Sequence, residues 1–253
     1  MTRRWSVFSA GWGLALAVLI AGPWAGLGAS MGAGEALAEE RPAVEPVLST
    51  YEAFFRAGSL DRIEGGAPLT YVVQTRGWSG KDAATPPPAE AADEHLTLTV
   101  QADGQAVLAR KGHQLGAFPA SVGNPVIMYF METTLRDMAR QSGGSPFYIR
   151  NRLKEALLRA AERQEVTVER GAGTKPAERV TIHPFAGDAE RDRMGGFRDM
   201  SLSVTFSEEV PGEIVALEAA APDDAGDAES GYRHSLRLEG ETDAGQQQGS
   251  LTR

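Results

Sequence analysis

Several short stretches of this chain alternate hydrophobic and polar residues with a period of two. In the clearest, Leu96, Leu98 and Val100 alternate with threonines, and Asp103-Gly104 follows before apolar residues resume. Alternation on both sides of an Asp-Gly pair predicts a β-hairpin with its leucines on one face and its threonines on the other. One face of the sheet is therefore expected to face water or a lumen.

Similar patterns predict further strands, and turn residues rather than long crossovers separate most of them. Short connections favour antiparallel pairing. Together with a helical segment described below, the pattern predicts an α+β fold, in which a curved antiparallel sheet of about seven strands packs on a central helical hairpin. The additional strands are expected over residues 69–75, 166–168, 180–182, 201–207, 214–217 and 232–238.

The period becomes helical between residues 118 and 162. Asn124-Pro125 and Ser145-Pro146 each place a capping residue before a proline, which is typical of a helix start. Gly143-Gly144 separates the two expected helices. Their apolar stripes consist of Ile127, Phe130, Met131, Leu135 and Met138 in the first helix, and of Ile149, Leu153 and Leu157 in the second.

The first 38 residues follow a different pattern. Arg3-Arg4 precede an apolar run from Gly13 to Gly22, and small residues lead to Ala36-Leu37-Ala38. This order is typical of a secretory signal peptide, and the run is shorter than the roughly 20 residues of a membrane-spanning helix. We therefore expect cleavage near Ala38 and a periplasmic protein. The paired arginines leave the twin-arginine route open beside the general secretory route.

The remaining chain is expected to form one domain that begins with a short helix. Ser49-Thr50-Tyr51-Glu52 has the pattern of a capping box, and Gly58 is expected to end the helix. The predicted organisation is a signal peptide over 1–38, a flexible lead-in over 39–47, a single α+β domain over 48–239 with a loop insert at 78–93, and a disordered tail over 240–253.

Composition removes several classes of function. The chain has no cysteine, which excludes disulfides, thiolate metal sites and thiol nucleophiles. Its net charge of −9 argues against nucleic acid as the main partner. No second apolar run approaches membrane-spanning length, so the cleaved protein is not expected to be an integral membrane protein.

Motifs for catalysis are also missing from the sequence. The four histidines lie outside metal-ligand spacing of one another, and no Gly-x-Ser-x-Gly or His-Glu-x-x-His pattern occurs. We therefore expect a protein that is not an enzyme and that uses no metal or cofactor. A hydrolase with an unrecognised site stays open as an alternative.

Two sets of residues are candidates for binding. The helical stripes are rich in methionine, a side chain that adapts to irregular apolar ligands, although ordinary cores use it as well. Glycines before a helix start, with arginines nearby, can hold a phosphate or carboxylate, although these arginines can instead meet acidic side chains on the sheet. The candidates are Ile127, Phe130, Met131, Met138, Ile149 and Leu153 for an apolar ligand, and Ser145, Arg150 and Arg152 for an anion.

Two segments of the central third carry a resemblance. Residues 118–125, Phe-Pro-Ala-Ser-Val-Gly-Asn-Pro, and residues 143–152, Gly-Gly-Ser-Pro-Phe-Tyr-Ile-Arg-Asn-Arg, resemble a signature of uncharacterised exported proteins of Gram-negative bacteria. The layout is more loosely similar to half-barrel periplasmic lipoprotein carriers. That similarity implies a curved antiparallel sheet that holds acyl chains beneath covering helices.

The favoured function is therefore a non-enzymatic periplasmic binding or carrier protein for a lipid or another apolar or amphipathic ligand. A cell-envelope module that binds or assembles with a protein partner, without a small-molecule ligand, is the principal alternative. In that case the basic face between Arg150 and Arg159, or the long loops, would make the contacts.

Overall fold

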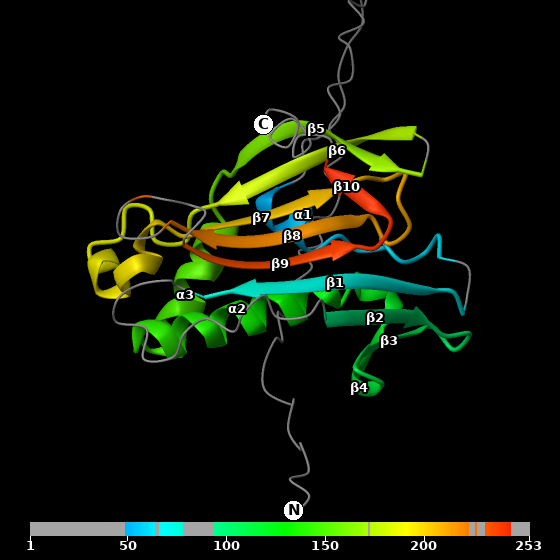
Figure 1. The fold of residues 1–253 in the computed structure, drawn as a ribbon, viewed down its shortest axis with the longest axis horizontal. Helices are drawn as coiled ribbons and strands as arrows, with labels where there is room; N and C mark the ends of the chain where they lie inside the picture. Colours follow the sequence, from blue (N-terminus) through cyan, green and yellow to red (C-terminus); the bar gives the residue numbers. More distant parts are fainter. Residues whose placement is uncertain are drawn as a thin grey trace, which may run out of the picture. The chain divides into compact units, whose positions relative to one another are not determined.

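Ten strands in the described part of the chain form one antiparallel sheet (Figure 1). The computed structural model describes residues 49–63, 66–77, 94–171, 173–222, 226 and 231–243, all of which belong to the unit Pro46–Arg253. The predicted signal peptide, the lead-in, the loop insert at 78–93 and the tail from residue 244 onward lie outside the described residues.

Each strand pairs antiparallel with its neighbours, in the order β10-β5-β6-β7-β8-β9-β1-β2-β3-β4. Only the pairings of β9 with β1 and of β10 with β5 join strands that are distant along the chain. The bounds are β1 Pro68–Arg76, β2 Glu94–Val100, β3 Gln105–Arg110, β4 His113–Pro119, β5 Glu162–Arg170, β6 Gly173–Ile182, β7 Ser201–Phe206, β8 Ile214–Ala221, β9 Tyr232–Leu238 and β10 Glu241–Asp243.

The α+β class and the antiparallel sheet are confirmed, but the expected number of about seven strands is too low. Strand β4 escaped prediction because it lies at a sheet edge, where nearly every residue is exposed and the sequence shows no alternation. Strand β10 lies in the segment that was expected to be a disordered tail, and it pairs with Val168–Arg170 of β5. Strand β10 has only three residues, so its pairing with β5, rather than a pattern in its own sequence, defines it as a strand.

The sheet has one apolar and one polar face, as the alternation predicts. Cross-strand partners share a face. The register joins Tyr71 to Leu96 and Leu238, and these three side chains are buried. On the other face, Thr97 and Ser203 are partly exposed. The core therefore lies on one side of the sheet.

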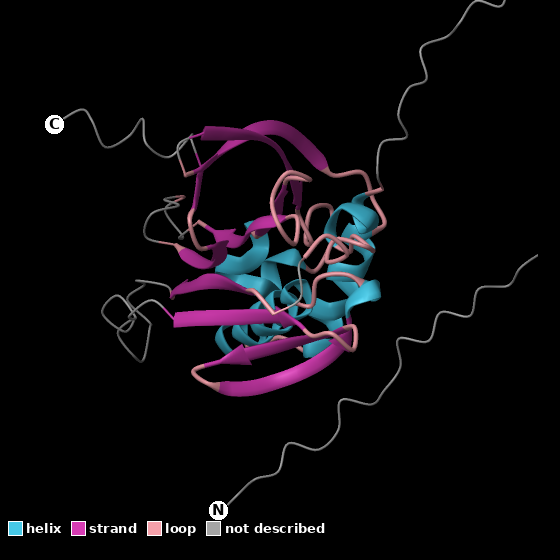
Figure 2. Ribbon diagram, turned by 90° about the vertical axis from the view of Figure 1, so that its right-hand side faces the viewer, coloured by secondary structure: helices cyan, strands magenta, loops and turns pink. Residues whose placement is uncertain are grey.

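The helices occupy that side. The end-on view in Figure 2 shows the strands curving around the helices, which fill the concave face. The helices are α1 Thr50–Phe54, α2 Val126–Ser142 and α3 Pro146–Leu157, with two short 3₁₀ helices, η1 Ala120–Val122 and η2 Arg191–Asp199. Helix α2 contacts α3, η2 and β8.

Local signals mark most helix ends, with one exception at the end of α1. The predicted capping box is present, because the Ser49 hydroxyl accepts from the Glu52 N–H at 3.2 Å and Glu52 accepts from the Ser49 N–H at 2.8 Å. Helix α1 ends at Phe54, earlier than the expected Gly58. Gly143 follows α2 in a left-handed conformation (φ 67°), as expected of a helix stop.

The start of α2 is built around Asn124. This buried side chain donates to the Tyr71 hydroxyl at 3.2 Å and to the Gly212 carbonyl at 3.1 Å, and it accepts from the Val126 N–H at 3.1 Å. The helix begins at Val126, two residues after Asn124. Asn124 therefore joins α2 to β1 and to the turn before β8, so this residue of the 118–125 segment has a structural role.

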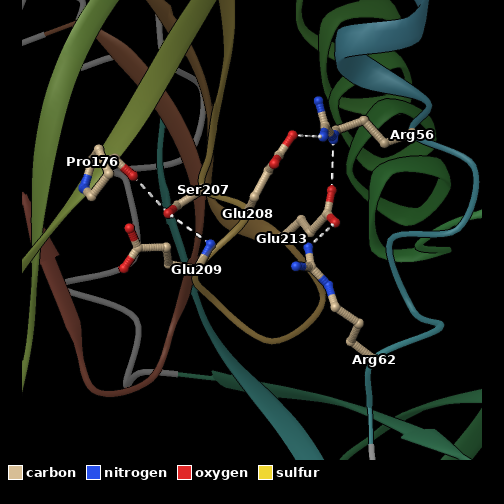
Figure 3. Close-up of polar contacts among 7 residues, drawn as sticks. All are labelled: Arg56, Arg62, Pro176, Ser207, Glu208, Glu209 and Glu213. Atoms are coloured by element: carbon tan, nitrogen blue, oxygen red, sulfur yellow. Dashed lines mark hydrogen bonds and ion pairs between the residues drawn. The ribbon is translucent and has the colours of Figure 1, made fainter.

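A second polar network ties the chain after α1 to the β7–β8 turn (Figure 3). Glu213, almost buried, accepts from Arg56 and from Arg62, both at 2.7 Å. Arg56 also pairs with the exposed Glu208 at 2.9 Å, and its guanidinium lies 4.5 Å from the centroid of the Phe206 ring. In the same turn, the Ser207 hydroxyl donates to the Pro176 carbonyl at 2.6 Å.

Candidate functional site

The interface between the helices and the concave face of the sheet contains the residues predicted to hold an apolar ligand. Five of the six are buried within the hydrophobic core, and the sixth, Met131, is partly buried against it. The structure therefore brings the predicted set together in one layer. The five buried members are Ile127, Phe130, Met138, Ile149 and Leu153.

All five methionines of the described residues lie in the helical layer or at its end. Met128, Met131 and Met138 are in α2, Met194 is in η2, and Met200 caps η2. Their burial ranges from complete at Met138 and Met200 to 40% exposure at Met128. The sheet supplies none of them, so the adaptable side chains of this interface all come from the covering helices.

Two polar contacts attach α2 to β9 within this apolar interface. His234 Nε2 lies 3.1 Å from the Thr133 hydroxyl, and the Tyr232 hydroxyl donates to Asp137 at 3.2 Å. Four residues of helix rise about 6 Å, and two residues of strand rise about 6.7 Å. The two spacings nearly match, so α2 runs alongside β9 in the opposite direction. We call Thr133, Asp137, Tyr232 and His234 the α2–β9 anchor.

The hydrogen bonds of His234 define its neutral form. The Thr133 hydroxyl donates to the carbonyl oxygen of Tyr129 at 2.8 Å or to that of Phe130 at 3.0 Å, so it can only accept from the histidine. We therefore assign the ring hydrogen of His234 to Nε2, so that Nδ1 accepts from the Thr75 hydroxyl at 2.8 Å. The ring also stacks on Phe130, with centroids 5.5 Å apart.

Burial is the main cause of the altered acidity of the anchor. It lowers the pKa of His234 to about 4, with Arg110 adding to the effect and a hydrogen bond to the Gln74 backbone carbonyl, which favours the protonated ring, opposing it. Burial also raises the pKa of Asp137, against the opposing effects of Arg140 and of the Tyr232 hydroxyl. The pKa of Tyr232 is raised by burial and by the neighbouring Asp137 carboxylate. Near neutral pH, well above its lowered pKa, His234 is neutral.

Charged residues of β2 and β3 lie beside the anchor. Glu94 pairs with Arg110 and, at 2.5 Å, with Lys111. Arg110 also interacts with the Tyr129 hydroxyl of α2, where it partly offsets the rise in pKa that burial causes. These contacts hold the end of β3 against α2 near the point where β2 begins.

The predicted anion site carries its own acidic partners. Arg150 lies 3.4 Å from Glu132, and Arg152 lies 2.6 Å from Glu155 and 3.7 Å from Asp188. Ser145 is exposed and precedes α3 without a side-chain cap. The carboxylates lie on α2, on α3 and in the loop before η2. Pairing of these arginines with acidic side chains was the expected alternative to an anion site, but the acidic partners were expected on the sheet.

The same corner of the molecule holds a tyrosine–aspartate pair. The Tyr148 hydroxyl donates to Asp188, and its ring packs against Phe185 with centroids 6.2 Å apart. Burial, followed by the bond to Asp188, raises the pKa of Tyr148 to about 12, and the same bond lowers the pKa of Asp188. Tyr148, Arg150 and Arg152 of the 143–152 segment therefore all have partners within the protein itself.

Chemically, the interface is predominantly apolar, and its histidine is enclosed. The ring nitrogens of His234 are both occupied by threonine hydroxyls, and the ring is 3% exposed. Around it lie the aliphatic and aromatic side chains of α2 and the sheet. The anchor adds a few directional contacts that fix the helix above the sheet.

Sequence reasoning did not identify the anchor. Its partners lie 101 positions apart for Thr133 and His234, and 95 positions apart for Asp137 and Tyr232. One local signal existed, because Thr133 and Asp137 are one helical turn apart beside the apolar stripe. The strand side offers only the alternation of Tyr232 and His234 with arginine and serine.

Comparison of the sequence with models of protein families and with curated proteins found no match. Within the described ranges, histidine and acidic side chains do not gather in groups of three that could hold a metal ion. Among the helices of the described residues, none is long and apolar enough to cross a membrane.

Proposed function

We propose that this chain is a non-enzymatic periplasmic protein that binds and carries a lipid or another apolar or amphipathic ligand between the concave face of its sheet and its covering helices. The observation that carries the proposal is the segregation of the five methionines of the described residues into the helical layer. An unbranched thioether side chain can repack around ligands of different shape, whereas the aliphatic side chains of the sheet form a firm floor.

In the ligand-free state the side chains fill this layer themselves. Ile127, Phe130 and Met138 are each at most 1% exposed. A ligand must therefore enter as α2 separates from the sheet, and few polar contacts resist that movement besides the anchor and Asn124. The exposed end of the layer at Met128 is the natural point of entry.

The periplasmic location rests on the N-terminal pattern of paired arginines, an apolar run and small residues before Ala38. Detection of the chain in the periplasmic fraction, with an N-terminus near residue 39, would support it. Recovery of the intact chain in the cytosol would contradict both the location and the carrier function.

Ligand binding is tested with protein isolated from its own cells under native conditions. We expect extraction and mass spectrometry to find lipid, and we expect a fluorescent apolar dye to bind saturably and to be displaced by fatty acid. Met138→Trp fills the buried layer and should weaken dye binding, whereas Leu158→Trp, at an exposed position at the end of α3 and outside the layer, should not. Protein free of lipid that also fails to bind dye would rule out the proposal.

The kinetics of dye uptake test whether α2 must move. Tyr232→Phe removes the hydroxyl that reaches Asp137 but keeps the ring, so dye should enter faster. Tyr148→Phe removes a comparable hydroxyl contact outside the layer and is the matched control. Equal rates in the two variants would show that separation of α2 from β9 does not limit entry.

The alternative, an envelope module that binds a protein partner, has one observation in its favour. Phe147 and Leu158 are 75% and 80% exposed at the two ends of α3. They are eleven positions apart, close to three helical turns, and so share one face of the helix. Stoichiometric crosslinking to one envelope protein that Phe147→Asp abolishes would favour this function over ligand carriage.

A further inference from the structure

The two edges of the sheet differ in how they are protected. Strand β5 has the sequence Glu-Arg-Gln-Glu-Val-Thr-Val-Glu-Arg, and β10 pairs with its last three residues. Strand β4 has the sequence His-Gln-Leu-Gly-Ala-Phe-Pro and, among the strands of the described residues, pairs with β3 alone. One edge is thus highly charged and partly covered, whereas the other is uncharged from Gln114 to Pro119.

An edge strand offers unpaired backbone N–H and C=O groups to other strands, and natural proteins usually block it with charges, proline or a bulge. Strand β4 has a register shift opposite Leu108/Ala109 and a proline at its end. The shift leaves Leu115 without a register partner in β3, and Leu115 and Phe118 are 49% and 38% exposed. Two large apolar side chains on a seven-residue edge favour a strand partner over solvent.

Charge along this edge indicates what the partner is. At the β3–β4 turn, Lys111 and His113 are exposed, and Lys111 keeps 66% of its side chain accessible while it pairs with Glu94. At the other end of β4, Ala120 donates to the Gly104 carbonyl at 2.9 Å, which places the exposed Asp103 beside that end. The edge is therefore basic at one end, apolar in the middle and acidic at the other.

A second copy of the chain fits such an edge. Antiparallel pairing about a two-fold axis brings the basic end of each β4 to the acidic end of the other, and each contact is made twice. It also places the uncharged centres of the two strands together and satisfies their outward backbone groups. We propose that two copies of this chain associate through β4–β4 pairing, which joins their sheets into one continuous sheet.

The oligomeric state of the full chain, in the form in which cells accumulate it, tests the proposal. We expect light scattering coupled to gel filtration to give the mass of a dimer. The double variant Leu115→Lys/Phe118→Lys should be monomeric with an unchanged circular dichroism spectrum. Leu158→Lys, which introduces the same charge at an exposed apolar site on α3, should remain dimeric.

The absence of native cysteine allows a direct test of the contact. Ala117→Cys, at an exposed position of β4, should form an intermolecular disulfide under mild oxidation, whereas Ser145→Cys at the start of α3 should not. Asp103→Asn removes one charge from each of two symmetric contacts and should raise the dimer dissociation constant about two- to fivefold.

A wild-type chain that stays monomeric at its solubility limit would overturn the proposal. A dimer that survives the two lysines in β4, or that Ala117→Cys fails to crosslink, would show that any association uses another surface. Dye binding in the lysine variant is a separate measurement, so loss of the dimer and loss of the carrier function remain distinguishable.

Discussion

At the scale of single residues, the adjacent threonines of α2 have opposite environments. The Thr133 hydroxyl bonds to backbone carbonyls and to His234, whereas the Thr134 hydroxyl is fully buried and has no hydrogen-bond partner in the described structure. A buried hydroxyl without a partner costs free energy that an apolar group of the same shape does not.

We therefore expect Thr134→Val to raise the free energy of unfolding by about 1 kcal/mol. Thr133→Val, one position earlier in the same helix, should lower it by about 1–3 kcal/mol because it leaves the His234 N–H unpaired. Urea unfolding of both variants measures the difference. A loss of stability in Thr134→Val would mean that its hydroxyl has a partner, such as a buried water.

His234 makes stability depend on pH. Its pKa falls from 6.5 to about 4 on folding, so between these values the unfolded chain binds a proton that the folded chain does not. The contribution of His234 is complete above pH 6.5 and is lost as the pH falls toward 4.

Unfolding measured across this window should show that the wild type loses roughly 3 kcal/mol more than His234→Gln, which cannot titrate. Carboxylates titrate in both proteins and cancel in the comparison. Parallel curves for the two proteins would show that His234 does not titrate differently on folding.

At the scale of elements, glycine decides how the chain enters α2. Gly123 has φ 117° and ψ −173°, a region open to glycine alone, and a Cβ there would lie 2.6 Å from the Arg56 carbonyl oxygen. Gly143 also has positive φ, but a Cβ there meets open space. The first glycine is required by conformation and by close approach, the second by conformation only.

Gly143→Ala should therefore cost about 1 kcal/mol, whereas Gly123→Ala should cost about 3 kcal/mol or more. Thermal unfolding monitored by circular dichroism compares the two. Similar costs would indicate that the backbone after α1 shifts to make room, and that the close contact at Gly123 is not a constraint.

At the scale of the whole molecule, the network around Glu213 joins segments about 150 positions apart. Glu213 keeps 10% of its side chain exposed and is held by Arg56 and Arg62, whereas Glu208 keeps 70% exposed and pairs with Arg56 alone. Removal of one partner from a buried ion pair leaves a buried charge uncompensated, but an exposed pair contributes little.

We expect Glu213→Gln to destabilise the protein by about 3 kcal/mol. Glu208→Gln should change the free energy of unfolding by less than about 0.5 kcal/mol. Chemical unfolding of the two single variants is sufficient to compare them. If both variants unfold like the wild type, Asn124 and the apolar core alone hold the β7–β8 turn against α1.

Several features of this protein follow from its sequence alone, because they depend on contacts within a few residues. Alternation identified most strands, the Ser49–Glu52 pattern identified a capping box, and Pro146 and Gly143 marked helix ends. The apolar stripes named the residues of the helix–sheet layer, because a period of 3.6 residues places them on one face.

Other features were decided only by the tertiary structure, because their partners lie far apart in the chain. Residues 241–243 form a strand because they pair with β5. Strand β4 forms at the edge of the sheet although its sequence does not alternate. The α2–β9 anchor forms because helix and strand rise by similar distances where the fold lays one along the other. No local pattern carries that alignment, and the candidate site depends on it.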